Sequence, residues 1–61
     1  MFGTRLKELR KKNGYTQVTL AEKLSVSKGT VAMWEVGKRK PDFEMLCTLS
    51  ELFDVYIRPV E

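Results

Sequence analysis

Apolar side chains recur every three or four positions in several stretches of this chain, which is the spacing of one face of a helix. A first helix is predicted from near Phe2 to Lys12, with Asn13-Gly14 closing it and with Phe2, Leu6 and Leu9 on one face. A last helix is predicted after Pro41, with Asp42 as its N-cap. Its apolar face is expected to contain Phe43, Leu46, Leu49, Ser50 and Phe53.

Residues 17–35 predict two short helices joined by a tight turn. Thr16 is the expected N-cap of the first, whose narrow apolar face contains Leu20, Ala21 and Leu24. Ser27 is the expected N-cap of the second, which buries Val31 and Trp34. Only Ser25-Val26 lie between the helices, so we expect a steep crossing with Val26 filling the corner, as in a helix-turn-helix.

The pattern changes after Asp54. Residues 55–60, Val-Tyr-Ile-Arg-Pro-Val, are β-branched and aromatic, and Pro59 prevents a further helical turn. We therefore expect a short strand there. It would either pair with the same strand of a second copy, through Val55, Tyr56 and Ile57, or lie against the domain as a tail.

Length and composition limit the classes of site that this chain can hold. Its 61 residues predict one domain, 1–61, with a small stability margin that a dimer would increase. The single cysteine, Cys47, is expected to be a small buried hydrophobe in a reducing compartment. With one cysteine and no histidine, we expect no zinc site and no histidine-based triad. No cofactor is expected, and no enzyme is expected because no pair of acids with a base or a metal ligand converges in residues 17–35.

Charge is distributed unevenly along the chain. Residues 1–40 contain ten of the eleven basic side chains and three acids, a net charge of +7, whereas residues 41–61 have a net charge of −4. The basic part contains the predicted helix-turn-helix, as phosphate binding requires. No segment is apolar enough to predict a signal peptide or a membrane span, so a soluble cytoplasmic protein is expected.

Between residues 4 and 55 the sequence resembles the Cro and lambda-repressor-like (XRE) helix-turn-helix family. The resemblance lies in Gln17, the Ala four residues later, Val26-Ser27, and Val31 with Trp34-Glu35. It implies an all-α fold, a compact domain of four to five helices that binds double-stranded DNA. The family usually has glycine where Ser25 stands, so we expect strain in a left-handed turn residue.

The resemblance also implies roles for individual residues. The candidates for reading base edges are Ser27, Lys28, Gly29, Thr30, Ala32 and Met33. Lys28 is expected to contact a guanine, and Met33 either a thymine methyl group or the core. Gly29 cannot read a base through a side chain, and either admits a closer approach to DNA or has no role.

Contacts to the DNA backbone are expected from four residues, Gln17, Lys38, Arg39 and Lys40, although the last three could also form an ordinary solvated charge run. Arg10 and Glu35 stand where many relatives have a partly buried salt bridge. The alternative for Arg10 is a free phosphate ligand.

These features predict a sequence-specific transcription regulator, a repressor that binds a palindromic operator as a homodimer. Repression is the simplest output because occupying a promoter needs no further machinery. The alternative is a HipB-like antitoxin that binds a toxin protein and regulates its own operon. A helical interaction module without DNA binding fits the charge distribution less well.

Overall fold

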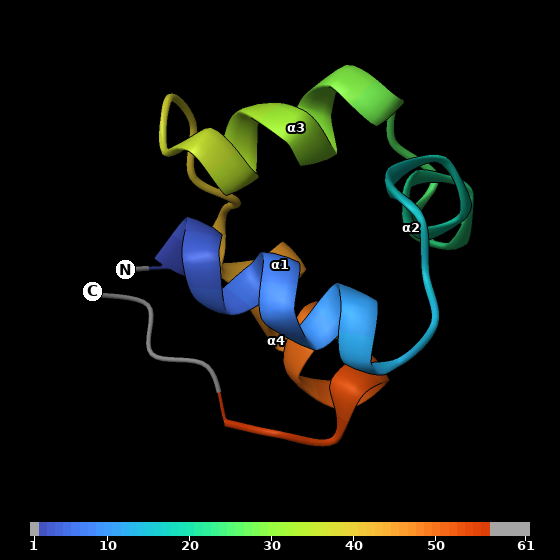
Figure 1. Cartoon of the computed structure of the whole chain (residues 1–61). Coiled ribbons are helices and arrows are strands. Elements are labelled where there is room, and N and C mark those ends of the chain that lie inside the picture. The colour runs from blue at the N-terminus through green and yellow to red at the C-terminus, as the bar shows by residue number, and fades with distance from the viewer. Residues whose placement is uncertain (1, 57–61) are drawn as a thin grey trace.

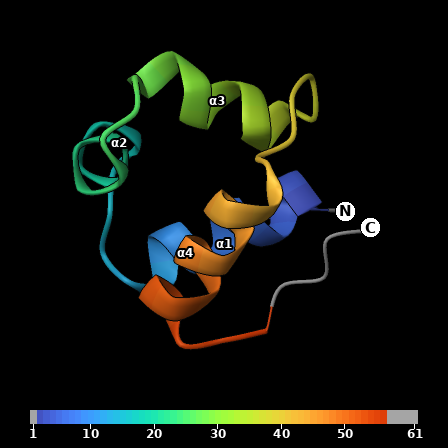
Figure 2. The ribbon, with the colours of Figure 1, turned by 180° about the vertical axis from the view of Figure 1, so that it is seen from behind.

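The computed structural model describes residues 2–56, which form four helices and no strand. They are α1 (Phe2–Lys12), α2 (Gln17–Leu24), α3 (Lys28–Val36) and α4 (Phe43–Phe53). The all-α class and all four predicted helices are confirmed. Figures 1 and 2 show α3 along one side of the molecule, nearly perpendicular to α2, with α1 and α4 on the other side.

Side-chain caps fix the starts of three helices, at the residues predicted. The amide of Thr19 donates to Thr16 Oγ1 at 3.0 Å, and the amide of Thr30 donates to Ser27 Oγ at 3.1 Å. The amide of Met45 donates to Asp42 Oδ1 at 2.9 Å. Each bond satisfies an amide that has no partner within its own helix, so these residues set where the helices begin.

Each helix is followed by a residue in the left-handed region. These residues are Gly14, Ser25, Gly37 and Asp54, with φ values of 79°, 59°, 83° and 54°. The next amide then bonds back into the helix, as in Val26 N to Ala21 O at 3.0 Å. The expected left-handed conformation of Ser25 is confirmed. It lets the chain change direction between α2 and α3 within three residues.

All four helices contribute to one core. Each supplies one completely buried side chain, namely Leu6, Leu20, Val31 and Leu49. Val26 packs against this core at the turn, as predicted. The remaining core residues are Phe2, Leu9, Ala21, Leu24, Trp34, Leu46 and Phe53.

Two expectations for α4 are wrong. Phe43 is 72% exposed and Cys47 is also exposed. Phe43 is the first residue of α4, and because Cα–Cβ bonds tilt toward the helix N-terminus, its side chain projects past the end of the helix. Cys47 lies four residues after Phe43, on the same side of α4, so it is exposed too and is not a buried hydrophobe.

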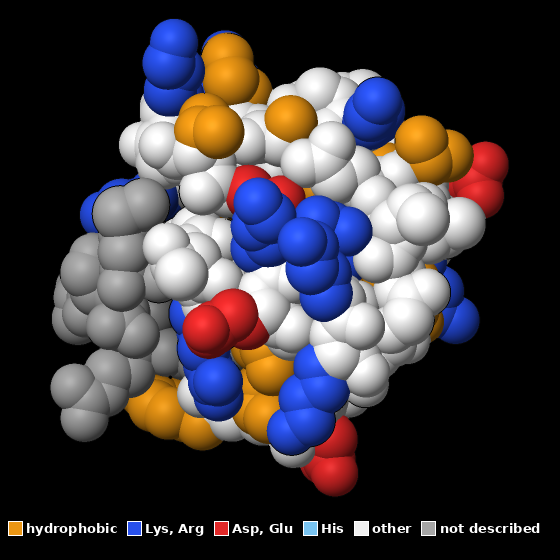
Figure 3. All heavy atoms as spheres, in the orientation of Figure 1, with side chains coloured by type: hydrophobic (Ala, Val, Ile, Leu, Met, Phe, Trp, Pro, Cys, Tyr) orange, Lys and Arg blue, Asp and Glu red, His pale blue; other side chains and the backbone are white. Residues whose placement is uncertain are grey.

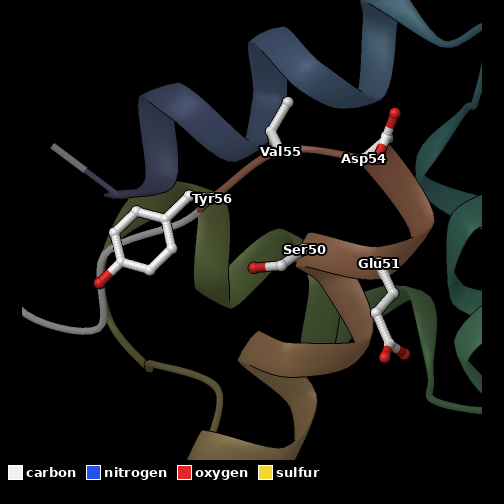
Figure 4. Close-up of a pocket in the computed structure, with 5 residues that line it drawn as sticks. All are labelled: Ser50, Glu51, Asp54, Val55 and Tyr56. Atoms are coloured by element: carbon white, nitrogen blue, oxygen red, sulfur yellow. The ribbon is translucent and has the colours of Figure 1, made fainter.

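The described part of the expected C-terminal strand is not a strand. Val55 forms a bend after α4 and packs partly against the core, while Tyr56 is 80% exposed. Figure 4 shows the two side chains turned in different directions at a shallow hollow beside the end of α4. Residues 57–60 of that expectation lie outside the described residues.

Gly3 brings α1 against the end of α3, a role that the sequence pattern did not reveal. A Cβ atom at Gly3 would lie 2.2 Å from the backbone oxygen of Glu35 and 2.7 Å from that of Trp34. Neither oxygen can move without moving the helix. The two helices can therefore approach this closely only with glycine at this position.

A buried polar network joins α1 to α3 two turns further along α1. Arg10 Nε donates to Glu35 Oε2 at 2.6 Å, and the two side chains are 8% and 4% exposed. Arg10 Nη1 also donates to the carbonyl of Tyr15 at 2.9 Å, and Gln17 Nε2 donates to Glu35 Oε1 at 3.1 Å. Arg10 is therefore engaged inside the fold and is not free to bind a phosphate.

Replacing Arg10 by Ala is expected to lower the free energy of unfolding by about 3–5 kcal/mol, because it leaves the Glu35 carboxylate buried without an opposite charge. Adding Glu35→Gln to Arg10→Ala removes that charge and should recover part of the loss. Urea unfolding followed by the fluorescence of the buried Trp34 measures both effects. Equal stability of wild type and Arg10→Ala would contradict this role.

Replacing Ser25 by Gly is expected to raise the free energy of unfolding by about 1 kcal/mol, because glycine adopts the left-handed conformation without steric cost. For a domain of this size that corresponds to an increase of about 4–8 °C in melting temperature. Ser25→Ala, which keeps the Cβ atom, is the matched control and should give no increase. A lower melting temperature for Ser25→Gly would show that strain at this turn is not significant.

Candidate nucleic-acid interface

One face of α3 is turned away from the core. Val31 and Trp34 are buried, whereas Lys28, Gly29 and Met33 are exposed. Met33 is 38% exposed, so the alternative of a core side chain is wrong. The six candidate base-reading residues are exposed or half-buried on this face and its cap, and we name this set the α3 surface: Ser27, Lys28, Gly29, Thr30, Ala32 and Met33.

The α3 surface is hollowed at its centre. The hollow has a volume of about 420 Å³. Five of its six lining residues belong to the α3 surface, and the sixth is Arg39 of the basic loop. No heavy atom lies within 3.4 Å of the place where a Cβ at Gly29 would be. The missing side chain of Gly29 therefore contributes to an open space on the surface.

Gln17 lies at the first position of α2, next to the end of α3. It is half-buried, and its side-chain amide bonds to Glu35, a partner that the sequence did not indicate. Thr16 already caps the amide of Thr19. The first-turn amides of a helix have no partner within that helix and favour an anion, so the start of α2 offers a site for a phosphate group.

The basic loop after α3 is held against the helix at its start. The amides of Lys38 and Arg39 both donate to the carbonyl of Met33, at 3.0 and 3.3 Å. The side chains of Lys38, Arg39 and Lys40 are all exposed. The backbone of Lys38 and Arg39 is therefore held at the end of α3, and three exposed cationic side chains follow the α3 surface along the chain.

The basic and acidic residues, which are unevenly distributed along the sequence, also lie on different parts of the folded molecule. Figure 3 shows Lys and Arg side chains over α1 and near both ends of α3. α4 and its two cap residues carry Asp42, Glu44, Glu51 and Asp54 and no basic residue, and they lie away from α3 (Figure 1). α4 with its caps is therefore a negatively charged part of the molecule, and the described residues before Asp42 have a net positive charge.

The candidate residues for dimer contacts are only partly described. Val55 is half-buried and Tyr56 is exposed, while Ile57 lies outside the described residues. No helix between residues 2 and 56 is both long and apolar enough to cross a membrane.

Comparison with known proteins gives a consistent set of relatives. The HTH-type transcriptional regulator ImmR of Bacillus subtilis is 45% identical over 53 residues, which cover 87% of this chain and 42% of ImmR. AnsR of the same organism, also an HTH-type transcriptional regulator, is 44% identical over 50 residues, 82% of this chain and 43% of AnsR. The HTH-type transcriptional activator BcrR of Enterococcus faecalis is 41% identical over 56 residues, 92% of this chain and 28% of BcrR.

The chain thus spans half or less of the length of these relatives, and the shared part contains the helix-turn-helix. A protein-family profile described as helix-turn-helix matches residues 6–60, which include α2, α3 and the turn between them. The chain belongs to this helix-turn-helix family.

Proposed function

We propose that this chain binds double-stranded DNA sequence-specifically, with α3 in the major groove, and regulates transcription. The observation that supports this proposal is the exposed α3 surface, which is followed by a basic loop whose first amides bond to the carbonyl of Met33. An α-helix fits the major groove, where each base pair presents a distinct pattern of donors and acceptors. The flanking cations would then face the phosphates.

Within this docking, the side chains have different tasks. Lys28 is exposed in the first turn of α3 and is proposed to donate to O6 and N7 of a guanine. Gln17, Lys38, Arg39 and Lys40 are proposed to contact phosphates, which supply affinity but carry no sequence information. Arg10 would act through Glu35, which bonds to Gln17 and so holds it near the DNA.

We further propose that the protein acts as a homodimer and represses by occupying a two-fold operator. The α3 surface of one copy spans few base pairs, so a second copy is needed for a long, selective site. Among the relatives, BcrR is named an activator, so family membership alone does not set the direction of regulation. The antitoxin alternative was supported by the expected C-terminal strand, of which Val55 and Tyr56, the two described residues, form no strand.

Titration of the purified protein into the duplex immediately upstream of its own gene, against a scrambled duplex near physiological salt, tests the proposal. A preference of about a thousandfold or more is expected for a specific regulator. Equal, weak and salt-sensitive binding to both duplexes would reduce the interaction to nonspecific electrostatics and would contradict sequence-specific regulation.

Substitution of two lysines, Lys28 and Lys40, distinguishes base reading from phosphate binding. Lys28→Ala is expected to lower discrimination at one base pair by about 1–3 kcal/mol. Lys40→Ala is expected to weaken binding to all duplexes alike and to reduce the slope of log affinity against log salt by about 0.9. Affinity measured on single-base variants of the preferred duplex at several salt concentrations distinguishes the two. If Lys28→Ala also weakened binding to all duplexes alike, Lys28 would not be a base-reading residue.

A further inference from the structure

The hollow on the α3 surface has a glycine, Gly29, in its wall. Its lining contains Ser27, Gly29, Thr30, Ala32, Met33 and Arg39. A Cβ at Gly29 would meet only Ser27 Oγ, at 3.8 Å, which is an ordinary van der Waals contact. Glycine is unfavourable inside a helix relative to alanine, and here neither packing nor a positive φ requires it. The fold would therefore accept a side chain that the sequence leaves out.

The lining offers mainly apolar groups to a molecule that enters the hollow. Ser27 Oγ and Thr30 Oγ1 lie 2.9 Å apart and share a hydrogen bond, and Ser27 Oγ also caps the amide of Thr30. These hydroxyl groups already have partners. Methyl and methylene groups of Thr30, Ala32 and Met33 remain, together with the cationic side chain of Arg39.

The major groove of DNA presents one apolar group that fits this lining, the methyl group on C5 of a pyrimidine. We infer that the hollow receives a 5-methyl group, of thymine or of 5-methylcytosine, and that Gly29 is a specificity-determining residue because it leaves room for that group. This inference rests on the proposed function. Arg39, which the loop fixes beside Met33, would face a phosphate of the DNA near that base.

Removing single methyl groups from the DNA tests the inference. In the duplex preferred in the titration above, each thymine is replaced in turn by uracil, which keeps the hydrogen-bonding groups and loses only the methyl. At one position per half-site, the wild-type protein is expected to bind the uracil duplex about fourfold more weakly, the effect of losing one buried methyl contact. Comparing the affinities for duplexes with cytosine and with 5-methylcytosine at that position shows whether the hollow also accepts the methyl group of 5-methylcytosine.

A larger side chain at residue 29 should fill the hollow and abolish the difference in affinity between the thymine and uracil duplexes. Gly29→Leu places an aliphatic side chain in the hollow, and it is expected to bind thymine and uracil duplexes equally and the thymine duplex more weakly than the wild type does. Its melting temperature should be unchanged or higher, because leucine favours a helix more than glycine does. Cys47→Ala, at an exposed position on α4, is the control and should keep the fourfold ratio.

The outcomes separate this inference from the proposed function. A selectively bound duplex in which no thymine-to-uracil change weakens binding would overturn the inference and leave the proposed function intact. The same ratio in Gly29→Leu as in the wild type would also overturn it. If no duplex is bound selectively, the proposed function fails first and the inference fails with it.

Discussion

The buried ion pair between Arg10 and Glu35 holds together the parts of the molecule on which the α3 surface depends. It joins α1 to the end of α3, and its further bonds reach the carbonyl of Tyr15 and the side chain of Gln17. The guanidinium and the carboxylate together thus fix the segment before α2, the start of α2 and the end of α3 relative to one another. Because two charges lose their hydration when they are buried, such a pair contributes more to orientation than to net stability.

The residues that stabilise the core and those proposed to recognise DNA lie on different sides of α3. Val31 and Trp34 face the core, while Lys28, Gly29 and Met33 face outward. Each helix contributes one completely buried side chain to the core, and none of these four belongs to the α3 surface. The exposed residues of that surface, among them Lys28, Gly29 and Met33, can therefore change with little effect on packing.

The sequence contained the local features of the fold but not the features that depend on where helices meet. N-caps and apolar faces follow from short-range chemistry, so they could be predicted, while the left-handed Ser25 was predicted from the resemblance to a family that usually has glycine there. The role of Gly3 could not, because only the position of the Glu35 carbonyl shows why a side chain is impossible there. The exposure of Phe43 and Cys47 likewise depends on where α4 extends beyond its neighbours. The bond from Gln17 to Glu35 required the geometry of three segments.

The two hydrogen bonds from Lys38 and Arg39 to the carbonyl of Met33 have a consequence for how such a protein would search for its site. They keep the backbone at the start of the basic loop at a constant position relative to Met33 and so to the proposed base-reading residues. In the proposed docking, loose electrostatic association would already align α3 with the groove. The protein could then slide along the duplex and test successive base pairs without reorienting, so a correct site would be recognised within the encounter that found it.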